Sequence, residues 1–170
     1  MPVLDLEAYI PTYLTQCTNK WASSSSRMYL ARFGIGINEW RVMTLLASTP
    51  GITASRMSVI MGLDKALVSR ALVVLEEQKY ATRGLPQSKG RRETFLTPAG
   101  WSLHNKILKL ALARQAQLLD GFSKAEVGTL LKLLKRLTEN AVRLQNSEAE
   151  EFSMEEIRKA PRASSKSGNL

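Results

Sequence analysis

Ser69 and Arg70 carry the most specific side-chain chemistry in this chain of 170 residues. If the segment is helical, with about 100° between successive residues, they share one face with the small side chains of Ala66 and Val73. Arginine can donate two hydrogen bonds to O6 and N7 of guanine, and serine can donate or accept one. Small neighbours let a helix approach closely. The pattern predicts a helix that contacts base edges in the major groove of double-stranded DNA.

The elements around this face support the prediction. The helix is expected to begin after Asp64, as the N-cap, and to end near Lys79. Lys65 lies at the margin of the outer face, where a helix N-terminus suits a phosphate. The opposite face is apolar and is predicted to pack inward; it consists of Val68, Ala71, Leu72 and Leu75.

A shorter helix is predicted just before it, opened by Thr53 and closed by Gly62. Two helices joined by so short a turn are typical of a helix-turn-helix, although any tight helical hairpin resembles one. Thr53 and Ser55 stand at the start of the shorter helix and could contact phosphate groups.

A basic hairpin is predicted to follow the two helices. Residues 81–85 and 93–96 are expected to form short strands, and residues 86–91 a turn. Lys89, Arg91 and Arg92 could contact the DNA backbone or enter a minor groove, whose negative potential attracts arginine. Thr97, as a cap, and Pro98 then begin another helix. A helix-turn-helix followed by a hairpin is a winged helix, so the fold class is mostly α with a small β-hairpin wing.

Long amphipathic helices are expected on both sides of the winged helix. The first runs from Leu6 to Phe33, and Asn38 caps the next. Two more follow the wing, the second capped by Ser123. Their apolar stripes fit packing within the chain or against a second copy, and their length favours a homodimer. The predicted organisation is an N-terminal dimerisation helix (6–37), a winged helix-turn-helix (38–97), C-terminal dimerisation helices (98–146) and a flexible tail (147–170).

Composition restricts the function. The net charge of +9, from 24 Lys and Arg against 15 Asp and Glu, suggests a polyanionic partner, nucleic acid or an anionic membrane. The basic residues are dispersed, which argues against a membrane surface. One cysteine, Cys17, and one histidine, His104, suggest no disulfide, metal, cofactor or enzymatic site. The absence of a membrane span and the acidic N-terminal segment favour the cytoplasm.

The order of these elements resembles the MarR family of bacterial regulators over roughly residues 6–144. The residues that carry the resemblance are Phe33-Gly-Ile-Gly-Ile-Asn-Glu-Trp-Arg-Val42, Leu63-Asp-Lys-Ala-Leu-Val-Ser-Arg-Ala-Leu-Val-Val-Leu-Glu76 and Leu96-Thr-Pro-Ala-Gly100. The resemblance implies a two-fold dimer with interlocking terminal helices, bound to a palindromic operator as a repressor. The family's Asp-x-Arg pattern in the wing is replaced by Ser88-Lys89-Gly90-Arg91, and we expect Arg91 to take the arginine's role.

The resemblance also implies release from DNA by a small aromatic carboxylate. Ligand-binding candidates that offer hydroxyls, charge and an aromatic surface are Ser23, Ser26, Arg27, Trp40 and Arg41. Alternatively, the two arginines hold the interdomain geometry and Trp40 belongs to the core. Nothing in the sequence explains the serine run from 23 to 26.

Two other functions stay open. One is a protein-interaction adaptor that keeps the winged helix without specific DNA binding. The other is a repressor that senses peroxide through Cys17, as in another branch of the family. Cys17 falls on the apolar stripe of the first helix, so a buried and inert thiol is expected.

Overall fold

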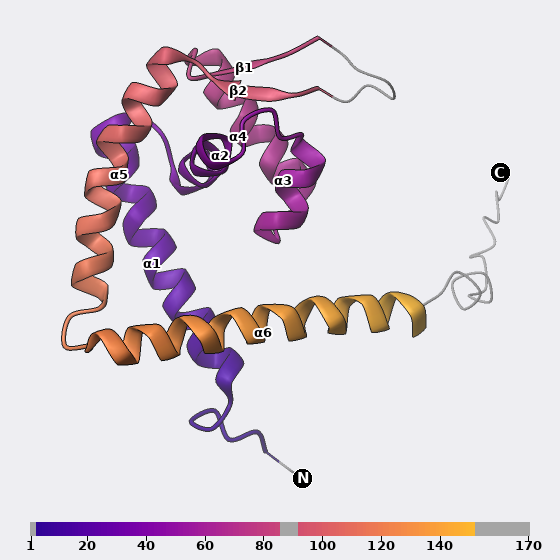
Figure 1. Ribbon diagram of the computed structural model, residues 1–170. Helices are drawn as coiled ribbons and strands as arrows, with labels where there is room; N and C mark the ends of the chain where they lie inside the picture. The colour runs from indigo at the N-terminus through magenta and orange to yellow at the C-terminus, as the bar shows by residue number, and fades with distance from the viewer. Residues whose placement is uncertain (1–2, 86–91, 152–170) are drawn as a thin grey trace, which may run out of the picture. The chain divides into compact units, whose positions relative to one another are not determined.

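The computed structural model describes residues 3–85 and 92–151. Within these ranges the chain forms six helices and one antiparallel pair of strands (Figure 1). This confirms the predicted class, mostly α with a small hairpin. The elements are α1 (Ile10–Phe33), α2 (Ile37–Ser48), α3 (Ala54–Met61), α4 (Lys65–Glu77), β1 (Ala81–Arg83), β2 (Thr94–Leu96), α5 (Pro98–Leu118) and α6 (Lys124–Glu151).

The described residues fall into two units, one up to Gln115 and one from Ala116 onward. The first holds α1 to α4, the hairpin and most of α5, and the second holds α6. No helix in the described ranges is long and apolar enough to cross a membrane.

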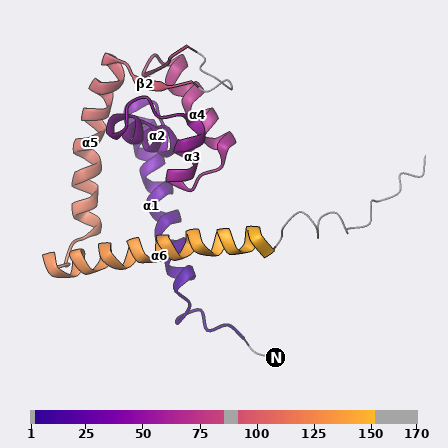
Figure 2. The ribbon, with the colours of Figure 1, turned by 45° about the vertical axis from the view of Figure 1, so that its right-hand side comes forward.

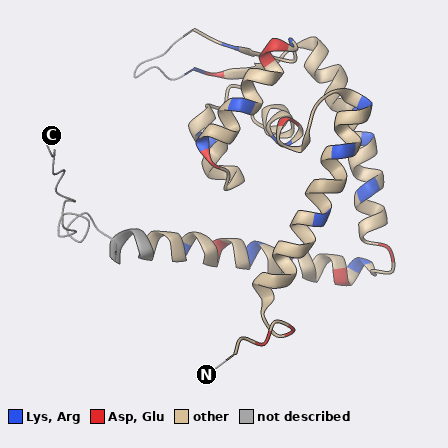
Figure 3. Cartoon of the chain, turned by 180° about the vertical axis from the view of Figure 1, so that it is seen from behind, with Lys and Arg blue, Asp and Glu red and all other residues tan. Residues whose placement is uncertain are grey.

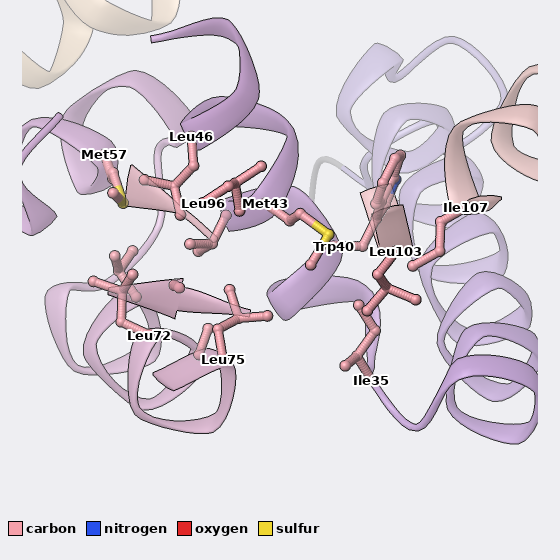
Figure 4. Close-up of a cluster of buried hydrophobic side chains, with 14 of the residues drawn as sticks. Ile35, Trp40, Met43, Leu46, Met57, Leu72, Leu75, Leu96, Leu103 and Ile107 are labelled. Carbon is pink, nitrogen blue, oxygen red and sulfur yellow. The ribbon is translucent and has the colours of Figure 1, made fainter. Parts of the chain in front are cut away.

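The core of the first unit lies where α2, α3, α4 and the hairpin meet. Met43 and Leu46 of α2 and Met57 of α3 are fully buried there. They face Leu72 and Leu75 of α4, and Leu96 of β2 lies among them (Figure 4). The sequence separation of these residues means that the helix-turn-helix depends on the helix before it and the strand after it.

The same core continues into an aromatic cluster with side chains from α1, α2 and α5. Figures 1 and 2 show the backbones of these three helices near one another. The rings of Trp40 and His104 are stacked, 5.4 Å apart at 29°. Tyr29 meets Trp40 edge-on at 6.0 Å, and its side chain is only 1% exposed. Burial raises the pKa of the Tyr29 hydroxyl, while the nearby positive charge of Arg114 opposes that shift. Aromatic packing of this kind fixes the angle between neighbouring helices.

The first helix begins later than the sequence suggested. The prediction placed its start at Leu6, whereas α1 starts at Ile10 with Tyr9 as N-cap. Pro11 explains the difference, because proline fits the first helical turn, where its missing N–H needs no partner. The expected end is confirmed, since Gly34 adopts the left-handed conformation at φ 71°.

The predicted cap of α2 was also wrong. Gly36, rather than Asn38, is the N-cap, so Asn38 lies in the first turn. The Gly36 N–H donates to the Glu39 carboxylate at 2.8 Å. A glutamate three residues into a helix can satisfy the N-cap amide in this way, so a residue without a side chain can hold the position.

The second unit confirms Ser123 as a cap and extends the helix. The Glu126 N–H donates to Ser123 Oγ at 3.3 Å, and the Ser123 N–H donates to Glu126 Oε2 at 2.8 Å. Hydrogen bonds from the Ser123 side chain and backbone lower the pKa of Glu126. The helix α6 continues to Glu151, past the predicted end at residue 146, because the sequence there is rich in the helix formers Ala and Glu. Residues 152–170 of the predicted tail lie outside the described residues.

A close backbone approach joins α5 to the end of α4. The Thr97 N–H donates to the Tyr80 carbonyl at 3.0 Å, and Thr97 Oγ1 donates to the Lys79 carbonyl at 2.7 Å. The Gly100 N–H donates to Thr97 Oγ1 at 3.0 Å, which confirms the predicted Thr97 cap. A Cβ at Gly100 would lie 2.0 Å from the Tyr80 carbonyl oxygen. Only glycine therefore lets α5 begin at this place.

Gly100→Ala should lower the free energy of unfolding by about 1–3 kcal/mol, because the new methyl group forces α5 away from Tyr80. Chemical denaturation at fixed protein concentration measures the change. Ser102→Ala is the control, since Ser102 is exposed on the same helix and should stay within about 0.5 kcal/mol of the parent. Equal stability of the two variants would show that α5 can move away from Tyr80 at little cost in free energy.

Candidate nucleic-acid interface

The outer face of α4 has the composition that the sequence suggested. Lys65, Ala66, Ser69 and Arg70 are exposed, and Val73 is 45% exposed. The opposite face is buried, with Val68, Ala71, Leu72 and Leu75 each at most 1% exposed. Burial fixes the rotation of the helix about its axis. The five outer side chains are therefore brought together on one surface.

Asp64 caps this helix, as predicted. Its Oδ1 accepts hydrogen bonds from the Ala66 N–H at 2.7 Å and the Leu67 N–H at 3.3 Å. The carboxylate thus satisfies two amides at the start of the helix. Lys65, next to it, places a positive charge at the same end.

Ser58 fixes the turn between α3 and α4, which sequence reasoning missed. Its Oγ donates to the Leu63 carbonyl at 2.6 Å, and the Leu63 N–H donates to the Ser58 carbonyl at 3.1 Å. Gly62 between them has φ 58°, which glycine adopts without strain. The sequence does not distinguish a serine that fixes a turn from one on the surface. Ser58 is only 8% exposed, and this burial identifies its structural role.

The start of α3 combines a cap with an open surface. Thr53 Oγ1 accepts a hydrogen bond from the Arg56 N–H at 3.4 Å, so this hydroxyl caps the helix. Its proton stays available to a phosphate oxygen. Ser55, two residues further along the chain, is exposed. Both candidates therefore stand at the N-terminus of α3, a position that suits an anion.

The base of the hairpin is well defined. Ala81 pairs with Leu96 and Arg83 with Thr94, and the Gly84 N–H donates to the Glu93 carbonyl at 2.8 Å. On the other side of β2, the Gly51 N–H donates to the Thr94 carbonyl at 3.0 Å. Arg92 is exposed beside the strand. Lys89 and Arg91 lie outside the described residues.

A second polar cluster joins α1 to α5, and sequence reasoning missed it. Arg114 Nη2 donates to Ser24 Oγ at 3.1 Å and to Ser25 Oγ at 3.3 Å. Its guanidinium lies 4.9 Å from the centre of the Trp21 ring. Its buried Nε has no hydrogen-bond partner among the described residues. The cluster explains the serine run, because the small hydroxyls accept hydrogen bonds from an arginine on another helix.

No carboxylate from α1 or α5 can neutralise this arginine. Both helices carry Lys and Arg but neither Asp nor Glu (Figure 3). Among the described residues the structure records no ion pair that involves Arg114. The guanidinium is half-buried, so solvent screens its charge only in part. The cluster is therefore suited to an anion.

The five predicted ligand residues do not gather at one site. Trp40 is 7% exposed and belongs to the core, while Ser23 and Arg27 are exposed on α1. Ser26 Oγ accepts a hydrogen bond from the Ile37 N–H at 3.4 Å, which ties α1 to α2. Arg41 lines a groove of about 650 Å³ between α1, α2 and the end of α3.

Cys17 is exposed in the single chain, so the expectation of a buried thiol was wrong for this chain alone. The apolar residues around it on α1 are exposed as well, among them Tyr13 and Leu14. Within this chain the buried residues of α1 are Ser25 and Tyr29. The packing of the predicted stripe against a second copy stays a prediction. The sequence pattern could not tell whether the chain covers the stripe with its own residues.

Known proteins share this fold and sequence pattern. The model of the MarR family matches residues 33–93, from the end of α1 into the wing. The crystal structure of a MarR/EmrR family transcriptional regulator from Acinetobacter sp. ADP1 is 34% identical in sequence, covers 82% of this chain and 99% of its own, and has a TM-score of 0.77. The chain belongs to the MarR family of transcriptional regulators.

One further relative was found by sequence and another by structure. A putative transcriptional regulatory protein for the hcr operon of Thauera aromatica is 28% identical over 105 residues, which are 61% of this chain and 63% of that protein. The chain thus spans less than two thirds of that relative. The S. aureus MepR–DNA complex is 17% identical, covers 79% of this chain and 98% of its own, and has a TM-score of 0.68, which shows the shared fold.

Family membership confirms the expectation of a transcriptional regulator and the expectation that the protein is not an enzyme. Members are transcriptional regulators and not enzymes, as the sparse inventory of catalytic side chains suggested. The roles of individual side chains in binding DNA or a ligand stay predictions.

Proposed function

We propose that this protein binds a palindromic DNA operator as a homodimer in the cytoplasm and represses transcription from the promoter that it covers. The observation that carries the proposal is the exposed face of α4. Arg70 and Ser69 supply donors for base edges, and Ala66 allows a close approach. Lys65, Thr53, Ser55 and the wing residues Lys89, Arg91 and Arg92 would contact the backbone or the minor groove.

The exposed apolar side chains support the dimer. In α6, Leu131, Leu137 and Leu144 are 53%, 41% and 62% exposed. In α1, Ile10 is 56% exposed. A stable monomer rarely leaves so many large side chains in water. A two-fold dimer would cover them and would present two copies of α4, which is why the operator should be palindromic. The proposed domains are 6–37 and 98–146 for the dimer and 38–97 for DNA.

We further propose that a small aromatic carboxylate releases the protein from DNA. The Arg114 cluster supports this, because it combines an unneutralised guanidinium, two serine hydroxyls and the indole of Trp21. A carboxylate would pair with the guanidinium, and its ring would lie against the aromatic side chain. Such a ligand acts only if it binds the DNA-free geometry more tightly. Of the ligand-binding residues predicted from the sequence, Ser23 and Ser26 flank Ser24 and Ser25 in the chain. Arg41 lies at a separate groove.

Arg70→Ala should weaken binding to the operator by about 1–3 kcal/mol and relax the base preference at one position in each half-site. Fluorescence anisotropy measures this on the upstream DNA of the protein's own gene and on single-base variants of it. Arg56→Ala is the matched control, since Arg56 is exposed on α3 and its loss removes the same charge. Equal losses on operator and scrambled DNA would make Arg70 a phosphate contact. No binding to any DNA at low salt would favour the adaptor.

Leu131→Glu should weaken or abolish the dimer, because a carboxylate would then have to be buried in an apolar interface. Sedimentation across a concentration series measures the dissociation constant. Lys132→Glu is the control, since Lys132 is an exposed neighbour in α6 and its substitution should leave the dimer intact. A monomeric parent protein would contradict the proposed dimer itself.

Arg114→Met should abolish the release of operator DNA by benzoate while operator binding stays within about threefold of the parent. Methionine keeps much of the side-chain length without the charge. Benzyl alcohol, which has the ring without a carboxylate, should release no DNA from either protein. Arg32→Met removes a similar charge from the exposed surface of α1 and should respond as the parent does. A full benzoate response in Arg114→Met would place the effector elsewhere.

A further inference from the structure

A single ion pair joins α4 to the base of the wing. Arg83 Nε lies 2.6 Å from Glu76 Oε1, and the two side chains are 30% and 27% exposed. It is the only ion pair that the structure records among the described residues. Partial burial means that solvent screens this pair less than a pair of fully exposed charges. The contact is an ion pair without the alignment of a hydrogen bond, because Arg83 Nε has no hydrogen-bond partner among the described residues.

The two residues stand where the hairpin leaves the core. Arg83 is the last residue of β1, and Gly84 makes the last recorded β1–β2 backbone bond before residues 86–91. Nearer the core, Ala81 is 4% and Leu96 is 9% exposed, so packing fixes the inner end of the strands. The middle pair, Thr82 and Phe95, is exposed. At the outer pair Thr94 of β2 is 1% exposed and its carbonyl accepts from the Gly51 N–H, whereas Arg83 of β1 is only partly buried. Burial thus fixes the outer end of β2, and the side chain of Glu76 connects the outer end of β1 to α4.

We propose that the Glu76–Arg83 pair is a positioning element that sets the direction of the base of the wing, strands β1 and β2, relative to α4. The inference rests on the proposed binding of DNA. If α4 enters the major groove, the wing reaches the adjacent minor groove only at one angle, and the pair holds that angle before DNA arrives. Neither residue needs to touch DNA. Pre-ordering the wing spares the complex the entropy of ordering it during binding.

Electrostatics alone makes the opposite prediction, which allows a sharp test. Removal of a carboxylate near DNA should tighten binding, because less negative charge faces the phosphates. Glu76→Gln should instead weaken operator binding by about three- to tenfold, the loss expected when a wing contact is no longer held in place. Glu77→Gln is the matched control. Glu77 is exposed on the same helix, and its substitution should leave binding unchanged or slightly tighter.

Two further variants connect the effect to the wing. The exchange Glu76→Arg with Arg83→Glu keeps both charges and should recover most of the lost affinity. In a background with Arg91→Ala and Arg92→Ala, Glu76→Gln should have little further effect, because the wing contacts that it positions are gone. Equal affinities of Glu76→Gln and Glu77→Gln, or a full additive loss in that background, would overturn the proposal.

Hydrogen exchange of the DNA-free full-length protein separates this inference from the proposed function. In Glu76→Gln the amides of Gly84 and its neighbours in β1 and β2 should exchange faster than in Glu77→Gln, while those of α2 and α4 stay protected. If the parent protein binds no operator but this difference in exchange appears, the proposed DNA binding is contradicted and the positioning role of the ion pair is supported. Unchanged exchange at the hairpin would overturn the positioning role whether or not DNA binds.

Discussion

The burial of one face of α4 is the constraint on which the rest of the structure depends. Four side chains, Val68, Ala71, Leu72 and Leu75, are almost completely removed from water. Rotation of the helix by even one residue would expose some of them, at about 1.5–3 kcal/mol for each large side chain. The outer face is thereby fixed without any interaction of its own. Ser69 and Arg70 can stay exposed and unpaired, ready for a partner.

Contacts at both ends of α4 fix its position relative to the neighbouring elements. Ser58 and Gly62 set the turn that precedes the helix, and Asp64 satisfies its first amides. At its other end, the contact of Gly100 with the Tyr80 backbone places α5. The stacked rings of Trp40 and His104 then connect α5 back to α2. Packed side chains thus connect the junction of α1 and α5 to the helix-turn-helix.

Charge is distributed unequally between these parts. Within the winged helix, Glu76 neutralises Arg83, and Asp64 is committed to a cap. In α1 and α5 no acidic residue balances the lysines and arginines. Arg114 consequently keeps its charge in a half-buried place, held by serine hydroxyls that are weaker partners than a carboxylate. Among the described residues, Arg83 at the base of the wing thus lies beside a carboxylate, whereas Arg114 at the α1–α5 junction does not.

Features that depend on residues close together in the chain could be predicted without the structure. The period of the apolar residues gave the two faces of α4, and the caps Thr53, Asp64, Thr97 and Ser123 were all recognisable, because each acts on amides two or three residues away. Gly36 was missed as a cap because glycine has no side chain to mark it. Only the tertiary structure could show that Arg114 meets Ser24 and Ser25, or that Glu76 meets Arg83. These contacts join residues from different elements, and no local pattern records which elements will pack together.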